Sequence, residues 1–510
     1  MKSCLISCAV LIVILAGTGA AQTSQDYEYI NYIMERPFVE GYHFDFTGGG
    51  ARAEGMGKAF IAVSDDITAG SWNPAGLYVQ EKPIISLSWA SLDPRGSTNS
   101  NVFEGSAIFD HSGRFSGISA FSFIAPLRIK GHHFVGSFSL TRNFDEFQGD
   151  GFVGHGDSIS NIAGQDMFNV SSDFHYVSEL QGGLNSVNIG FGTRVYRNLS
   201  FGASMNVYTG KMVRDQYFDA FERWVSLKPD VVDSRRITGH ATILDTSSFS
   251  GYNVNIGFKL KGEALDVGLV VRTPFSLNIN TGRSIYTINR RAALDQGQLV
   301  TVGSDTVYFD DLLTKYSMPL MIGAGVVWRA SEKWLLATDI EYRGFSSGQV
   351  ERRDSLRIDP GGSNEEYYTK IDPRWNDVFT VRLGTEYLHQ TGIGLIPLRA
   401  GFGYLPTPAP SIDVDGRTSS AVNYNLSLGF GIHWNQIHLD WGYTYSIIDW
   451  EMSDQYEPVN DPDQPRIVRN RHNDWAYTLT KETWEDTDPS VIMEQKNRNH
   501  HLSFTFTGYF

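Results

Sequence analysis

The chain has 510 residues, a formal net charge of −15 and only two cysteines. Its acidic excess argues against nucleic acid or an anionic lipid surface as the principal partner. Charged residues make up 19%, aromatic residues 13%, and 51 residues are glycine, a composition that fits a β-protein with one lipid-facing and one polar face.

Residues 1–21 have the pattern of a secretory signal peptide. Lys2 is the only early charge, residues 8–16 are wholly apolar, and the small residues 19–21 suit cleavage. The apolar run is too short to cross a bilayer as a helix. Both cysteines, Cys4 and Cys8, lie in this segment. We therefore expect a mature chain without disulfides, thiolate metal sites or a cysteine nucleophile.

Most of the chain after Pro83 alternates apolar with polar residues, which predicts strands with one apolar and one polar face. The clearest examples are residues 422–434 and 437–447. We count about fourteen such segments, each near the length that a tilted strand needs to cross a bilayer. The sequence predicts an all-β fold, a transmembrane antiparallel barrel over residues 81–510.

The connections between these segments alternate in length. Tight turns such as 197–198 and 435–436 alternate with long polar stretches such as 142–183 and 210–250, which we expect to be loops. Short turns on one side and long loops on the other are typical of an outer-membrane barrel with periplasmic termini. The last residues, 500–510, alternate and end on Phe510, which resembles the signal read by barrel-assembly machinery.

The segment from Gly48 to Leu77 has no such alternation and is rich in glycine and alanine. It ends in a tight turn at Asn73, Pro74, Ala75 and Gly76, where the proline bars the preceding residue from helical geometry. Irregular backbone is tolerated at membrane depth only inside protein or a water-filled cavity. We therefore predict that residues 48–80 form a hatch in the lumen, the alternative being a periplasmic tail.

The hatch segment, GARAEGMGKAFIAVSDDITAGSWNPAGL, resembles the N-terminal hatch of the FadL/TodX-type outer-membrane transporters of long-chain fatty acids and hydrocarbons. Segments such as DVGLVVRTPFSLNI and LRAGFGYLPTPAP fall where that family has similar ones. The resemblance implies a fourteen-stranded barrel that takes up hydrophobic small molecules. It also implies ligand capture by extracellular loops, hatch movement, and lateral exit into the bilayer at a kink in the third strand.

The resemblance suggests positions for these steps. Gly136, in the expected third strand, is the candidate for the kink, because a glycine inside a strand often marks a bulge; it equally suits packing against the hatch. Apolar residues in the expected loop after that strand are candidates for ligand capture, or form the loop's own core. They are Phe144, Phe147, Phe152, Phe168 and Phe174.

Strand parity points several charged residues into the lumen. Their expected role is a paired network that anchors the hatch, with binding of a charged ligand headgroup as the other reading. They are Arg272, Asp339, Glu341, Arg382, Glu386 and Arg399. The sequence has no recognisable catalytic constellation, so we predict neither an enzyme nor a metal or cofactor site.

Residues 22–47 form an N-terminal extension that does not align with the family. We expect this extension either to fill the lumen or to extend into the periplasm. PorV-like accessory barrels of a secretion system share this barrel type and a similar N-terminal motif. A secretion-accessory or binding barrel without small-molecule transport is therefore the alternative function. Expected partners are outer-membrane lipid, a hydrophobic small molecule, barrel-assembly machinery during biogenesis, and a periplasmic or secretion partner.

Overall fold

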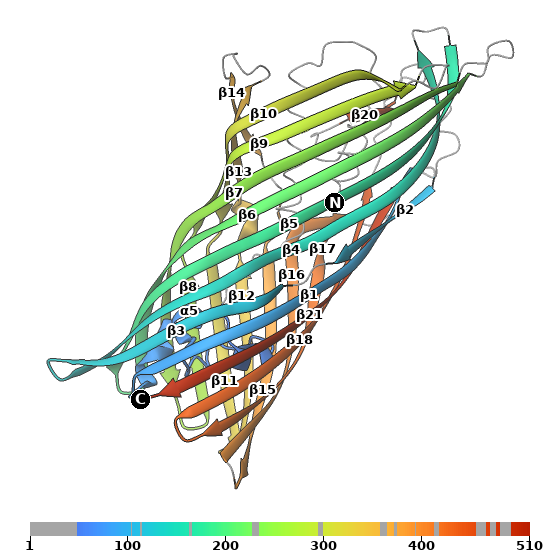
Figure 1. Ribbon diagram of the computed structural model, residues 1–510. Helices are drawn as coiled ribbons and strands as arrows, with labels where there is room; N and C mark the ends of the chain where they lie inside the picture. The colour runs from blue at the N-terminus through green and yellow to red at the C-terminus, as the bar shows by residue number, and fades with distance from the viewer. Residues whose placement is uncertain are drawn as a thin grey trace.

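The computed structural model describes residues 48–103, 105–112, 115–162, 166–226, 234–293, 299–357, 365–371, 375–392, 394–412, 418–454, 466–469, 476–479 and 491–510. The N-terminal extension, residues 22–47, and the expected signal peptide lie outside these ranges. The described residues form a closed antiparallel barrel that is much longer on one side than on the other (Figure 1).

Fourteen strands surround the lumen and make a closed barrel. Each pairs with the next, and the last strand pairs with the first. In spatial order they are β1 (Ile84–Phe103), β3 (Phe115–Ile129), β4 (His132–Ile162), β5 (Asp166–Tyr196), β6 (Leu199–Ser226), β7 (Ser234–Lys261), β8 (Leu265–Arg272), β11 (Met321–Ser331), β12 (Trp334–Arg343), β15 (Val378–Thr391), β16 (Gly394–Ile412), β17 (Thr418–Trp434), β18 (Ile437–Asp454) and β21 (Val491–Tyr509).

The alternating sequence pattern places apolar side chains on the outside of this wall. In β17, Leu426, Leu428 and Phe430 are exposed, whereas Asn425 and Ser427 between them are buried in the lumen. The same division holds for β15, whereas the buried face of β11 consists of glycine and apolar residues. An apolar outer face and a polar inner face are what a barrel in a bilayer requires.

The stretches expected to be long loops are largely strand. β4 and β5 stay paired as far as Ile162 and Asp166, and β6 and β7 as far as Val225 and Ser234. Cross-strand pairing satisfies the backbone groups of these extensions. Where the extensions adjoin the barrel, burial still alternates along them, and Met212 and Phe249 are buried in the lumen. The other strands beyond the barrel belt are β2 (Gly105–Ser112), β9 (Phe275–Ala293), β10 (Leu299–Met318), β13 (Val350–Arg357), β14 (Glu365–Ile371), β19 (Arg466–Arg469) and β20 (Ala476–Leu479).

Residues 48–80, termed the lumenal segment, lie inside the lower end of the barrel in Figure 1. They contain the short helices α4 (Ala51–Gly55) and α5 (Ala69–Trp72) and the 3-10 helix η1 (Pro74–Val79). A second 3-10 helix, η2 (Phe345–Ser347), follows β12. No helix in the described ranges has the length and apolar character needed to span a membrane.

The third strand of the barrel, β4, is regular at Gly136. This residue pairs with Ala125 of β3 and Phe191 of β5 without a register shift. The irregularity of β4 lies between Arg142 and Phe144. Gly136 also faces outward, since buried Val135 and Ser137 flank it, so it neither interrupts the pairing nor packs against the lumenal segment.

Candidate functional site

Asn73 ties the lumenal segment to itself and to the wall. Its side-chain oxygen accepts the N–H of Ala75 at 3.1 Å, which caps η1. Its amide donates to the carbonyl of Ile61 at 3.0 Å and to that of Phe258 in β7 at 3.2 Å. Pro74, Ala75 and Gly76 follow as the buried first turn of η1. The Asn73-Pro74-Ala75-Gly76 turn is thus a fixed point between the segment and the barrel.

The wall approaches the lumenal segment so closely that it needs glycines. A Cβ on Gly257 would lie 2.0 Å from the side-chain oxygen of Asn73, and one on Gly401 would lie 2.1 Å from the backbone nitrogen of Gly57. Neither contact is sterically possible, because close-packed interiors have no such room. The segment is therefore seated against the wall through its backbone.

A buried carboxylate of the wall holds the middle of the segment. Asp339 of β12 accepts the N–H groups of Phe60 and Ile61 at 2.6 and 2.8 Å. Beside it, Arg382 pairs with Glu341 at 3.2 Å, and both side chains are buried. Arg272 donates to the carbonyl of Ser71 at 3.5 Å.

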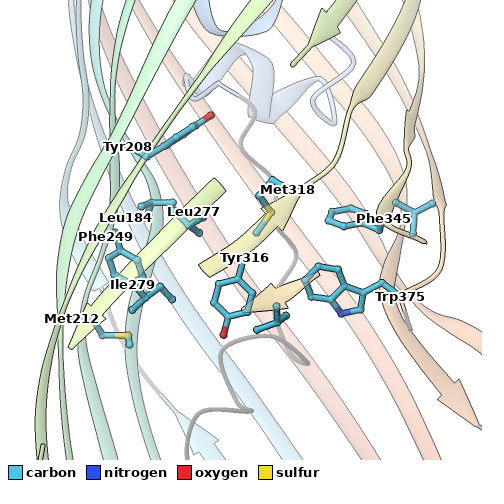
Figure 2. Close-up of a cluster of buried hydrophobic side chains, with 12 residues drawn as sticks. Leu184, Tyr208, Met212, Phe249, Leu277, Ile279, Tyr316, Met318, Phe345 and Trp375 are labelled. Carbon is cyan, nitrogen blue, oxygen red and sulfur yellow. The ribbon is translucent and has the colours of Figure 1, made fainter. Parts of the chain in front are cut away.

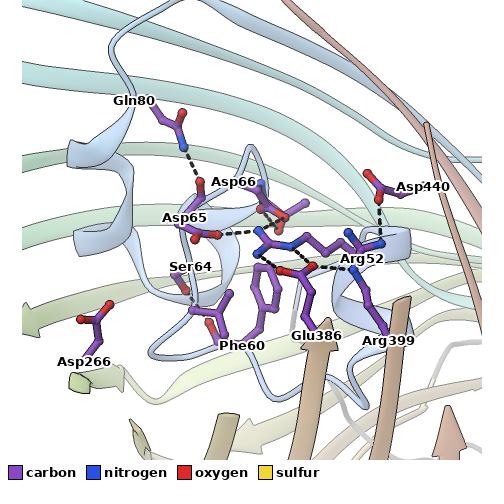
Figure 3. A network of polar contacts seen from close by, with 12 residues as sticks. Arg52, Phe60, Ser64, Asp65, Asp66, Gln80, Asp266, Glu386, Arg399 and Asp440 are labelled. Atoms are coloured by element: carbon purple, nitrogen blue, oxygen red, sulfur yellow. Dashed lines mark hydrogen bonds and ion pairs between the residues drawn. The ribbon is translucent and has the colours of Figure 1, made fainter. Parts of the chain in front are cut away.

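Glu386 joins the segment to a second set of charges (Figure 3). Arg52 of α4 grips its carboxylate with two hydrogen bonds of 2.9 Å, and Arg399 donates to it at 2.6 Å. Arg399 also donates to Asp440 at 2.7 Å. On its other side Arg52 pairs with Asp65. Bidentate arginine–carboxylate pairs fix geometry as well as charge.

Glu54, also in α4, contacts the wall at β18 and β21. It pairs with Lys58 at 3.4 Å and with His501 of β21 at 3.4 Å, and it accepts from Thr444 at 3.2 Å. Burial alone would raise the pKa of Glu54, but Lys58 and His501 outweigh it and lower that pKa to about 2. Glu54 therefore stays ionised in the lumen at neutral pH.

All six charged residues expected in the lumen are buried there. The sequence pattern did not identify Arg52, Asp65 and Asp440: Arg52 and Asp440 are partners of these residues, and Asp65 pairs with Arg52. Arg52 and Asp65 belong to an irregular segment without strand parity. Asp440 follows the inward parity of residues 437–447, and this parity could have placed its side chain in the lumen.

Beyond the lumenal segment, an apolar cluster lines the barrel (Figure 2). Tyr208 stacks on Phe275 with centroids 5.0 Å apart, and Phe345 meets Trp375 edge-on at 5.7 Å. The side chains come from β5, β6, β7, β9, β10, β13, β15 and η2, and from Trp375, which precedes β15. The apolar cluster consists of Leu184, Tyr208, Met212, Phe249, Leu277, Ile279, Tyr316, Met318, Phe345, Val350, Trp375 and Val378.

A row of asparagines separates this cluster from the lumenal segment. Asn188 donates to the carbonyl of Gly70 at 3.4 Å and to Asn206 at 2.7 Å. Asn206 donates to Asn253 at 2.8 Å, which also accepts the Tyr208 hydroxyl at 3.3 Å. Along the lumen, an apolar section therefore gives way to a polar one at Tyr208.

The ligand-capture candidates are only partly located. The backbones of Phe144, Phe147 and Phe152 lie in β4, and those of Phe168 and Phe174 in β5. Their side chains lie outside the described part of the structure. Among the described residues, no group of three or more histidine, cysteine or acidic side chains is arranged to hold a metal ion.

Several solved structures share this architecture. The toluene transporter TodX of P. putida superposes with a TM-score of 0.54 at 12% identity, over 91% of this chain and 99% of TodX. A Pseudomonas aeruginosa FadL homologue gives 0.50 at 13% identity, over 90% and 98%. The Ralstonia pickettii toluene transporter TbuX gives 0.50 at 12% identity, over 92% and 100%.

The chain has the FadL/TodX-type barrel fold. The prediction of an antiparallel barrel of about fourteen strands is thereby confirmed. At 12 to 13% identity the FadL/TodX-type likeness concerns the fold. Residues 162–389 also match the BamG family. A search of curated proteins gave no match.

Proposed function

We propose that this FadL/TodX-type barrel is an outer-membrane channel for the uptake of hydrophobic compounds, either long-chain fatty acids or hydrocarbons. The observation that carries the proposal is the apolar cluster, a group of buried hydrophobic side chains in the lumen that the row of asparagines separates from the lumenal segment. Apolar side chains do not favour the passage of water or polar solutes. An apolar ligand, in contrast, gains about 25 cal/mol of binding free energy for each Å² of apolar surface that it buries there.

In this proposal the ligand is captured at the long-stranded end and rests in the apolar cluster. The lumenal segment acts as a hatch that moves to let it pass toward a lateral exit. The tight turns and both ends of the wall then face the periplasm, and outer-membrane lipid surrounds the barrel. The bonds of Asp339 and Glu386 are those that hatch movement has to break.

The test is uptake of radiolabelled oleate and of toluene by cells that lack the protein and are complemented with variants. We expect Met318→Asp to abolish uptake, because it places a carboxylate in the apolar cluster. The matched control is Tyr368→Asp in β14, whose side chain is exposed. Uptake that is the same with and without the protein contradicts the proposal.

The match of residues 162–389 to the BamG family favours a second candidate, because the name points to barrel-assembly machinery. The protein would then be an accessory barrel, similar in role to the PorV-like alternative, with a periplasmic or secretion partner. Crosslinking in intact cells separates the two. Capture of assembly or secretion components, together with unchanged oleate and toluene uptake on deletion, favours the accessory role.

A further inference from the structure

The barrel wall has an open joint between β14 and β16. β15 pairs with β16 only as far as Val381 and Tyr404, yet β16 continues to Ile412. In the described residues, this outer part of β16 pairs with strands on its other side only, and β14 pairs with β13 alone. Among the described residues, one edge of β14 and one edge of the outer part of β16 therefore carry no ladder.

The sequence of β16 keeps this edge unpaired. Pro406, Pro408 and Pro410 have no N–H groups to offer a neighbouring strand, and proline in sheets is confined to edges and bulges. The carbonyl of Pro408 faces the joint, where it accepts the N–H of Asn376 at 2.8 Å. A strand of a partner protein could therefore form few backbone hydrogen bonds with this edge of β16.

Three residues close the joint. Trp375 is buried against Phe345. Asn376 donates from its backbone to Pro408 and from its side chain to Ser420 at 3.2 Å. Asp377 accepts the N–H of Ser346 and the hydroxyl of Tyr342, each at 2.7 Å.

The joint opens at a membrane boundary. Tyr342 packs on Phe379 at 5.1 Å, and Phe379 and the nearby Tyr424 are exposed on the outer surface. Trp334 and Tyr387 are exposed at the opposite ends of β12 and β15. Two such aromatic girdles mark the two interfaces of a bilayer. The joint therefore adjoins the interface at the long-stranded end.

We propose that the joint between β14 and β16, closed by Trp375, Asn376 and Asp377, is a side entrance through which the hydrocarbon chain of a ligand dissolved in the outer leaflet reaches the apolar cluster. The proposal rests on the proposed function and assigns its route of entry. A hydrocarbon chain needs no hydrogen bond from the proline edge. Trp375 is itself a member of the apolar cluster and meets Phe345 edge-on, so its displacement opens the cluster to the joint.

The test is a reversible staple, Asn376→Cys with Ser420→Cys, whose native side chains are 3.2 Å apart. The matched control is Ser247→Cys with Thr281→Cys, whose hydroxyls are 2.7 Å apart and whose residues pair directly with each other in the β7–β9 ladder. Cys4 and Cys8 are the chain's own cysteines, and both lie in the expected signal peptide. Loss of free thiols on oxidation verifies that the disulfide has formed, and their return on reduction verifies that it has opened.

The probe is a photoactivatable diazirine analogue of palmitate dissolved in the lipid of nanodiscs that hold the full chain. With the staple reduced, we expect crosslinks at Trp375 and Met318. With it closed, we expect their loss, and reduction restores them, whereas the control pair labels in both states. The same probe supplied from water on albumin labels the cluster regardless of the staple if a second route exists at the barrel mouth.

Persistent labelling from lipid with the staple closed overturns the side entrance. So does the absence of lipid-borne labelling in a protein that takes up oleate in cells, and in that case the proposed function stands. Absence of both oleate and toluene uptake by the wild-type protein overturns the proposed function itself, and the side entrance with it.

Discussion

Glu386 forms ion pairs with two arginines that come from different elements, Arg52 and Arg399. Replacing it by alanine leaves Arg52 and Arg399 facing each other without their shared carboxylate. Breaking a buried ion pair in this way costs about 3–5 kcal/mol. We expect Glu386→Ala to lower the thermal unfolding midpoint, followed by circular dichroism, and to make the chain more susceptible to trypsin at Arg52.

The control for that substitution is Arg95→Ala. Arg95 pairs with Asp93 at 2.8 Å, but it is largely exposed to solvent, and exposed pairs contribute little. We expect no measurable change in the unfolding midpoint. Equal effects of the two substitutions would mean that the lumenal network does not hold the segment.

Glu54 gives the segment a dependence on acid. Its folded pKa of about 2 lies below the ordinary value of 4.5, so its contribution to stability is complete above pH 4.5 and is lost as the pH falls toward 2. We expect Glu54→Gln to remove this part of the pH dependence. Thermal unfolding midpoints measured across that range check it, and parallel curves for the two proteins would contradict it.

At the scale of elements, the contact between β7 and η1 depends on a missing side chain. Gly257→Ala places a methyl group 2.0 Å from the Asn73 oxygen, so Asn73 has to leave its bonds to Ala75 and Phe258. Overpacking of this kind costs about 1–3 kcal/mol. Chemical denaturation checks the loss.

Gly136→Ala is the matched control, because the added methyl group would meet only the carbonyl oxygen of Ala125, at 3.9 Å. We expect it to be neutral in stability. A large loss at this position would instead indicate that β4 needs a glycine in a conformation other than the one described here.

The elements divide clearly into those that the sequence could and could not predict. Strands such as β17 were predictable because each alternate residue faces lipid, and parity alone placed Asp339 and Arg382 in the lumen. The partnership of Arg52 with Glu386 joins residues 334 positions apart, and no local pattern encodes it. The largely polar sequence of residues 142–183 and 210–250 predicted loops, whereas ladders between β4, β5, β6 and β7 make most of these residues strand.

At the scale of the whole molecule, the barrel should have one orientation in the membrane. Lys130 lies in the tight turn between β3 and β4, and Lys370 is exposed on β14 at the other end. We expect a membrane-impermeant maleimide to label Lys370→Cys on intact cells, and Lys130→Cys only after the outer membrane is permeabilised. The reverse pattern would place the termini outside.

The pairing of β1 with β21 also dictates an order of assembly. Ile84 pairs with Tyr509, and the N–H of Phe510 bonds to the carbonyl of Pro83, so the wall can close only after nearly the whole chain has been made. Residues 48–80 precede β1 and end up enclosed. They are made before any strand of the wall, and the wall surrounds them once β21 docks on β1. A chain truncated before β21 should therefore expose two open edges to aggregation, and its earliest-made residues would have no chamber to occupy.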